Sequence, residues 1–219
     1  MRKLIGPFLF SLVAFVILIA LGVWQVKRLH WKEGLLADIA AAQVNPPVPL
    51  AQIPRQFTKV VVNGTWDQAN AVLYGTDVRI DKLGSFLVEP LLRPNQPPVM
   101  VDRGFVPDGW KATDVPGAAV SVVGYIRNPD RMAWWSVADD PAERHFYTLN
   151  PVNIAARMGM TQPEPYVLVS MGDSTAYPEP SHDFPTLPNN HLSYALTWFS
   201  LALVDMVMFV LAARKTLRE

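Results

Sequence analysis

The chain has 219 residues, no cysteine, and equal numbers of basic and acidic side chains, 19 of each. The missing cysteines exclude disulfides, a thiolate nucleophile and Cys-ligated zinc, and the balanced charge without a Lys/Arg block excludes a nucleic-acid binder. The length suits one folded domain together with an apolar segment near each end of the chain.

The first apolar segment, residues 4–23, has no charged side chain and the length of about 20 residues that a transmembrane helix requires. It is longer than the apolar region of a signal peptide and lacks a good cleavage site, so we predict a retained helix. Residues 1–3 precede it. Trp24, Arg28, Trp31, Leu35 and Ile39 follow at helical spacing, which predicts a membrane-proximal amphipathic helix over residues 24–43.

Residues 44–171 are predicted to form an α+β domain with a mainly antiparallel sheet or partial barrel. Asn150 before Pro151 is typical of a helix start, so residues 152–158 should form a short helix. Residues 172–190 contain four prolines and are predicted to be an extended tether. The predicted strands are the β-rich runs 57–66, 71–80, 84–92, 99–106, 120–127 and 166–171.

The second apolar run has spanning length and predicts a transmembrane helix over residues 191–213. Basic residues Arg214, Lys215 and Arg218 follow it, which predicts a cytoplasmic C-terminus in residues 214–219. With two spans the N-terminus shares that side, so the domain between the helices should be exported. No Arg- and Ser-rich presequence precedes the first span, which favours a bacterial inner-membrane protein with a periplasmic domain over a mitochondrial precursor.

Candidate catalytic groups outside the helices have simpler structural interpretations. Ser174 in Gly172-Asp173-Ser174 is similar to an esterase nucleophile, but its position near the end of the domain favours a turn after a strand. His145 and His182 lack partners at metal-ligand spacing. Met158 and Met160 could bind cuprous copper but more simply fill the core.

The second helix carries an unusual face, because His191, Trp198 and Asp205 are spaced by seven residues. His191 could ligate a haem iron, or it could cap the helix or hydrogen-bond to the domain. Asp205 lies deep enough to need a partner. Ser11 in the first helix is at a similar depth, so an interhelical hydrogen bond competes with a contact to another membrane subunit.

Three ordered motifs are spread over nearly the whole length of the chain. The first is Leu21-Gly22-x-Trp24-Gln25-x-x-Arg28-x-x-Trp31-Lys32, after the first span. The second is Val101-Asp102-Arg103-Gly104-Phe105-Val106-Pro107. The third is Asn190-His191-Leu192-x-Tyr194-Ala195-x-Thr197-Trp198-Phe199, at the start of the second span. Together they resemble the surfeit locus protein 1 family of cytochrome c oxidase assembly factors, with Phe105 where that family usually has Trp.

The resemblance implies a non-enzymatic factor for aa3-type haem-copper oxidase that binds haem a transiently and assists its insertion into subunit I. His191 matches the family histidine implicated in binding haem a and is the expected iron ligand. His30 is outside the motif and is not carried over. Further haem contacts are expected from residues that can stack on a porphyrin or pair with its propionates: Trp24, Gln25, Arg28, Arg103, Tyr194 and Trp198.

Each of these further residues could instead be structural, because Arg28 and Arg103 could pair with carboxylates of the domain or extend along the membrane face. The implied partners are oxidase subunit I, the enzymes that make haem a, and membrane lipid. A carrier should ligate haem only modestly, so that the recipient outcompetes it. The alternative function is a cofactor-free scaffold that stabilises an oxidase assembly intermediate through its helices.

Overall fold

Two compact units make up the chain in this computed structural model, which describes residues 2–79, 81–111 and 119–218. One unit, residues 1–37 and 186–219, holds most of helix α1 (Arg2–Val44) and all of helix α3 (His191–Arg218). Both helices are long and apolar enough to cross a membrane, and most of the side chains in their apolar stretches are exposed. Core helices of a soluble domain would bury those side chains, so the protein is a membrane protein with two transmembrane helices.

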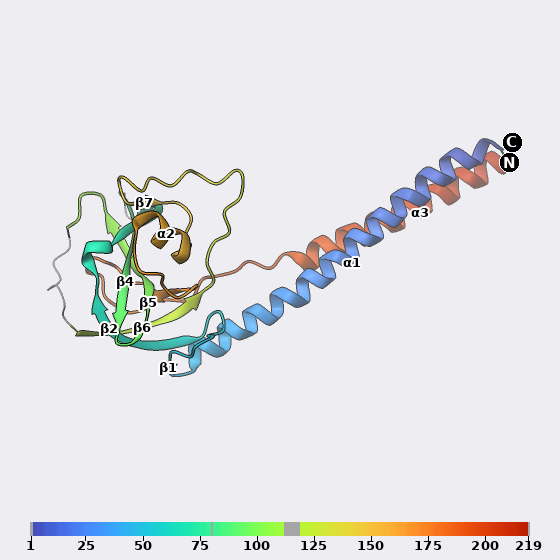
Figure 1. Cartoon of the computed structure of the whole chain (residues 1–219). Coiled ribbons are helices and arrows are strands. Elements are labelled where there is room, and N and C mark those ends of the chain that lie inside the picture. Colours follow the sequence, from blue (N-terminus) through green and yellow to red (C-terminus); the bar gives the residue numbers. More distant parts are fainter. Residues whose placement is uncertain (1, 80, 112–118, 219) are drawn as a thin grey trace. The chain divides into compact units, whose positions relative to one another are not determined.

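The other unit, residues 38–185, is built around a closed five-stranded barrel. Its neighbours are antiparallel except for one parallel pair, β5–β8, and the barrel closes where Thr65 and Trp66 of β2 pair with Leu92 and Leu91 of β4. The barrel strands run in the order β2 (Lys59–Trp66), β6 (Ala119–Arg127), β8 (Val167–Ser170), β5 (Gln96–Pro107) and β4 (Lys82–Arg93), and β2, β6, β5 and β4 are labelled in Figure 1.

Additional short elements extend this sheet beyond the barrel. Strand β3 (Val72–Arg79) pairs antiparallel with the first half of β4, and β7 (His145–Phe146) pairs with β3. Strand β1 (Val48–Pro49) pairs with β2, and the 3-10 helix η1 (Gln68–Asn70) connects β2 to β3. The two-residue strands were not predicted, because they are too short to show alternation of apolar and polar side chains.

Both faces of the central strands are buried, and successive residues alternate between two cores. Val99 and Val101 of β5 and Leu168 of β8 face the barrel interior together with Val60 and Val122. The intervening Met100 and Val167 face a second core, which includes Ile154 of helix α2 (Pro151–Met158). This double burial explains the continuous apolar runs in β5 and β8.

Helix α2 begins where the sequence predicts it. The Asn150 side chain accepts a hydrogen bond from the amide of Asn153 at 3.1 Å, and Pro151 occupies the first turn. Met158 and Met160 pack against the second core, which confirms their role as core filling. The prediction of two membrane helices flanking an α+β domain with an antiparallel sheet or barrel is also confirmed.

The first part of the predicted extended tether, residues 172–190, is fastened to the barrel unit. The amides and carbonyls of Phe105 and Glu179 exchange two hydrogen bonds of 2.9 Å, and Phe184 is buried against Tyr125 with ring centroids 4.8 Å apart. Gly104 makes this approach feasible, because its φ is +118° and a Cβ would lie 1.9 Å from the Glu179 carbonyl oxygen. The proline content indicated an extended chain but not the sheet edge to which it is fastened.

Asp102 is the one acidic side chain of the sequence motif at residues 101–107, and it is buried in the barrel unit. Its exposed fraction is 6%, and its Oδ1 accepts the Gly104 amide at 3.1 Å. Burial raises the pKa of Asp102 to about 6, although Arg127, the Gly104 amide and Arg79 favour its charged form. Because this pKa is higher than the ordinary value of 3.8, folding favours the neutral carboxyl group of Asp102. The contribution of Asp102 to the free energy of unfolding is therefore fully present below about pH 4 and is lost as the pH rises through about 6.

We predict that Asp102→Asn removes this loss while keeping the amide contact to Gly104. Between pH 4 and pH 7, the wild type should lose on the order of 2 kcal/mol of unfolding free energy relative to the variant. Thermal unfolding of the detergent-solubilised chain, followed by near-UV circular dichroism, measures the difference. Asp108→Asn, at an exposed position, is the control; equal pH profiles of wild type and Asp102→Asn would contradict the prediction.

Candidate functional site

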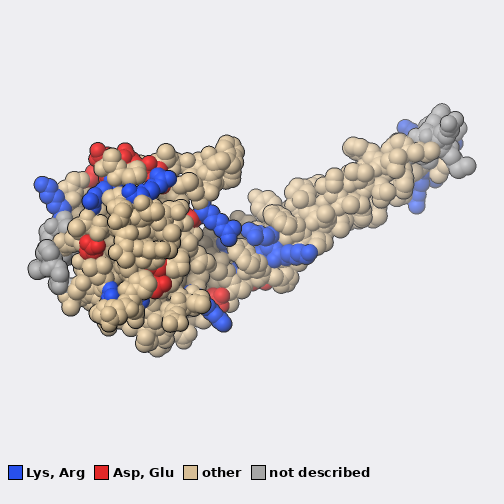
Figure 2. All heavy atoms as spheres, viewed as in Figure 1, with Lys and Arg blue, Asp and Glu red and all other residues tan. Residues whose placement is uncertain are grey.

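Helices α1 and α3 pack side by side in antiparallel orientation, as Figure 1 shows. Four contacts at successive levels define the seam between them. Phe8 lies against Phe209 with ring centroids 5.7 Å apart, Ser11 bonds to Asp205, Gly22 faces Phe199, and Gln25 bonds to His191. On the face shown in Figure 2, a long uncharged stretch of this pair is flanked at each end by basic side chains.

Ser11 Oγ donates a hydrogen bond to Asp205 Oδ2 at 2.9 Å, which confirms the predicted interhelical contact. A carboxyl group at this depth needs a polar partner inside the protein, because lipid offers none. The seven-residue spacing of His191, Trp198 and Asp205 also has its predicted consequence, since all three are partly buried on the face of α3 toward α1. Small residues Ala195 and Ala202, 2% and 1% exposed, allow the helices to approach closely between them.

The polar contact between His191 and Gln25 joins the first and third motifs. His191 Nδ1 lies 2.7 Å from Gln25 Oε1, and Gln25 is 9% exposed. An amide oxygen only accepts hydrogen bonds, so Nδ1 of His191 carries a proton and donates it. Histidines that bind metals through Nε2 are usually oriented in this way by a second acceptor. The helix pair therefore presents an imidazole ring whose orientation suits ligation through Nε2.

Trp198 lies two helical turns from His191 on the same face of α3. Its indole Nε1 is buried and has no hydrogen-bond acceptor within the described part of the chain, and the side-chain oxygen of Asn189 is in the same situation. Leaving such groups unpaired costs about 1 to 3 kcal/mol each. The end of the helix pair where α3 begins thus combines an oriented imidazole with two buried polar groups that lack hydrogen-bond partners among the described residues.

The other predicted haem contacts on the helices are exposed. Trp24 and Tyr194 are 52% and 54% exposed, so neither is packed in the seam. The Arg28 guanidinium carbon lies 4.5 Å from the ring centroid of Trp31, which is itself 53% exposed. Arg28 therefore has an aromatic partner on its own helix, and these side chains form an accessible cationic and aromatic surface beside Gln25.

Arg103 lies in the barrel unit and pairs there with a carboxylate of the domain. This is the structural role that the sequence predicts as the alternative to a haem contact. Its Nη1 is 2.7 Å from Glu89 Oε2, and its guanidinium carbon is 4.4 Å from the ring centroid of Trp66. The two charged side chains are 12% and 1% exposed. Removing one partner of such a buried pair leaves an uncompensated charge, so the pair holds β5 to β4.

The remaining candidates are occupied by structural contacts. Ser174 is exposed, and its Oγ accepts the Ala176 amide at 3.1 Å within a turn, as the turn interpretation predicts. His145 Nε2 contacts the Gly75 carbonyl at 2.6 Å, and its ring stacks on Tyr147. His182 lies 3.5 Å from Glu179. Among the described residues, no group of three or more His, Asp or Glu side chains could hold a metal ion.

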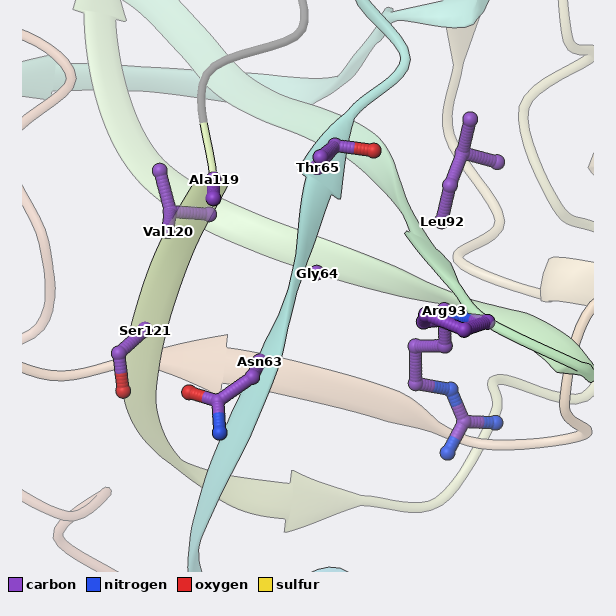
Figure 3. A pocket seen from close by; sticks show the side chains of 9 residues that line it. Asn63, Gly64, Thr65, Leu92, Arg93, Ala119, Val120 and Ser121 are labelled. Carbon is purple, nitrogen blue, oxygen red and sulfur yellow. The ribbon is translucent and has the colours of Figure 1, made fainter.

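A hollow of about 700 Å³ in the barrel unit also lacks reactive groups (Figure 3). Asn63 and Ser121 line it from the neighbouring strands β2 and β6. Arg93, on its other side, is engaged by the Pro97 carbonyl and by Glu164 at 2.7 Å. We therefore place the candidate site at the helix pair, around His191 and Gln25.

The sequence pointed to Gln25 through the first motif, but it missed what this side chain contacts. A buried glutamine in a helix that otherwise turns apolar side chains to its partner is an informative signal, because the amide needs a hydrogen bond. The depth alignment that paired Ser11 with Asp205 also places Gln25 beside His191. Asp102 was missed as a titrating group, since nothing local distinguishes its burial.

The Gln25 contact can be tested through the tautomer of His191. We predict that Gln25→Leu abolishes the preference for Nδ1–H, whereas Gln25→Glu, which keeps an acceptor, retains it. Nitrogen NMR of ¹⁵N-histidine-labelled protein in detergent distinguishes the two tautomers. Signals of His30, His145 and His182 serve as internal controls, and an unchanged His191 tautomer in Gln25→Leu would show that another group orients the ring.

Gly22 provides a test of the seam itself. A Cβ at Gly22 would lie 2.4 Å from the Phe199 ring, whereas a Cβ at Gly34 would have no neighbouring atom within 4 Å. Gly22→Val should therefore destabilise the helix pair by about 1 to 3 kcal/mol through overpacking, while Gly34→Val changes only helix propensity. The readout is thermal unfolding in detergent. Equal effects of the two substitutions would show that Phe199 moves away without cost.

Comparisons with known proteins extend over nearly the whole chain. The model of the SURF1 family matches residues 12–203. A SURF1-like protein of Rickettsia conorii is 27% identical over 216 residues, covering 93% of this chain and 89% of its own length. The SURF1-like protein of Monosiga brevicollis is 25% identical, covering 91% and 85%.

Surfeit locus protein 1 of Homo sapiens is 24% identical over 211 residues, covering 83% of this chain and 69% of its own length. The family match includes the polar contact of the seam between Gln25 in α1 and His191 in α3. It also covers the complete barrel unit. The chain belongs to the SURF1 family.

Proposed function

We propose that the protein is a non-enzymatic assembly factor for aa3-type haem-copper cytochrome c oxidase. It holds haem a through His191 and assists insertion of the haem into oxidase subunit I. Family membership supports the assembly role, and the contact between His191 and Gln25 is the observation that carries haem binding. The enzymes that make haem a are the proposed donors of this cargo.

The residues at the site fit a haem. His191 Nε2 is available because Nδ1 is engaged by Gln25, and iron takes an imidazole nitrogen as its axial ligand. The indole N–H of Trp198 and the amide oxygen of Asn189 are buried without partners, and a polar substituent of a bound molecule would satisfy them. The exposed Trp24, Arg28 and Tyr194 near this level supply an aromatic surface and a cation for propionates.

The partner of His191 also suits a carrier that must release its cargo. A neutral amide accepts the Nδ1–H bond less strongly than a carboxylate, so the imidazole is a weaker ligand than one backed by Asp or Glu. Transfer is favourable only if the recipient site binds the haem more tightly. The choice of glutamine at position 25 therefore favours transient binding.

The proposed location is the bacterial inner membrane, with both termini cytoplasmic and the barrel unit periplasmic. Arg214, Lys215 and Arg218 after the second span and Arg2 and Lys3 before the first support this orientation. Both ends of the barrel unit continue into the spanning helices, which carry the proposed haem site.

The test is a visible spectrum, with analysis of extracted haem, of protein purified in detergent after co-expression with the haem a synthesis enzymes. Wild type should contain haem a, and His191→Ala should lose it while remaining folded by circular dichroism. Gln25→Leu should bind haem about 10- to 100-fold more weakly. His30→Ala is the matched control, because His30 is exposed and its Nδ1 contacts the Val26 carbonyl of its own helix at 2.9 Å.

A wild type without haem, despite available haem a, would overturn the carrier role and leave a cofactor-free scaffold. Loss of haem in His30→Ala together with retention in His191→Ala would move the site along α1.

A further inference from the structure

The segment between Asp130 and Asp139 presents two adjacent tryptophans to the outside of the barrel unit. Trp134 is 91% exposed and Trp135 is 71% exposed, while Met132 and Val137 beside them are 50% and 62% exposed. We call residues 131–138 the tryptophan turn. Single exposed apolar residues are ordinary, but four in one short turn form a contiguous apolar patch that marks an interaction surface.

The base of the tryptophan turn is fastened to the domain at both ends. The Asp130 amide donates a hydrogen bond to the Leu149 carbonyl, and the Asp130 carboxylate accepts from the Leu149 amide, the Tyr74 hydroxyl and Arg127 at 3.0, 3.1 and 2.8 Å. Asp139 is the second anchor, since its Oδ1 accepts the amides of Tyr147 and Thr148. The exposed turn thus starts and ends at fixed points.

The tip of the tryptophan turn is ordered by its own hydrogen bonds. The Ser136 amide donates to the Ala133 carbonyl at 3.0 Å, and the Ala133 amide donates to Ser136 Oγ at 2.9 Å. The two indoles pack edge to face, with ring centroids 5.2 Å apart and an interplanar angle of 85°. A turn held in this way displays the indoles outward instead of folding them onto the core.

The charge of the tryptophan turn distinguishes a lipid surface from other partners. Arg131 is the only charged residue in the run Arg-Met-Ala-Trp-Trp-Ser-Val-Ala, and the adjoining acidic side chains all accept hydrogen bonds at the base: Asp130, Asp139 and Asp140. Tryptophan has a strong preference for the membrane–water interface, where its ring is apolar and its N–H remains hydrated. One cation with flanking indoles complements an anionic lipid headgroup region.

We propose that the tryptophan turn binds the headgroup region of a bilayer that contains anionic phospholipid. Both ends of the barrel unit are covalently continuous with membrane-spanning helices, so a lipid surface is present at a local concentration that no soluble partner reaches. Insertion of the turn gives the unit a further attachment to the membrane, independent of the two helices. This inference does not depend on haem binding by His191.

The test uses the natural absence of cysteine. Val137→Cys, labelled with an environment-sensitive fluorophore, reports the position of the turn in full-length protein reconstituted into vesicles of phosphatidylcholine and phosphatidylglycerol with shallow spin-labelled lipid. Gln96→Cys, at the exposed first residue of β5, is the matched reference site. The Val137 probe should be quenched at least about twofold more than the Gln96 probe.

The same Val137→Cys label in a Trp134→Ser, Trp135→Ser background tests the role of the indoles. Its quenching should fall to the reference value, with an unchanged unfolding temperature because both side chains are exposed. Quenching at the reference level in the wild-type background would overturn the proposal and assign the turn to a protein partner. Quenching that survives loss of both indoles would also overturn it. Haem content of the double serine variant should equal that of the wild type, which separates this result from the test of His191.

Discussion

Polar side chains inside the helix pair must find partners within the protein, because the hydrocarbon core offers none. Two interhelical hydrogen bonds, Ser11 to Asp205 and Gln25 to His191, meet this requirement at different levels of the antiparallel seam. They fix the register of α1 against α3, and Gly22, Ala195 and Ala202 allow the approach that makes them short. The orientation of His191, on which the proposed haem site depends, therefore follows from the same constraint that pairs the helices.

The second motif lies in the barrel unit, in strand β5. Asp102 caps the Gly104 amide, Arg103 pairs with the buried Glu89, and Gly104 admits the strand segment at Glu179. Phe105 is fully buried and meets Phe86 and Tyr177 edge to face. The motif thus combines charge pairing and close backbone approach at one point of β5, which explains how a run with both an acid and a base can lie inside a sheet.

The proposed activities use different physical properties of the two units. At the helix pair, the proposed haem ligation uses an imidazole that a neutral amide orients, which would make it specific in geometry and modest in strength. At the barrel unit, a turn fastened by Asp130 and Asp139 displays indoles that favour a lipid interface. A carrier that passes a hydrophobic cargo to a membrane subunit benefits from both, since the cargo and its recipient meet at the bilayer.

The sequence by itself determined the elements that depend on local patterns: the two spans, the capped helix α2, the six longer strands, and the shared face of His191, Trp198 and Asp205. Because Ser11 and Asp205 lie at similar depths in their helices, the sequence also predicted their hydrogen bond. Only the tertiary structure decided that the barrel closes between β2 and β4, that residues 177–184 lie on the sheet, and that Arg103 pairs with Glu89. It also decided that Gln25 orients His191, a contact across 166 positions. Periodicity specifies which face of an element is buried, but the partner buried against that face is set by how distant segments pack together.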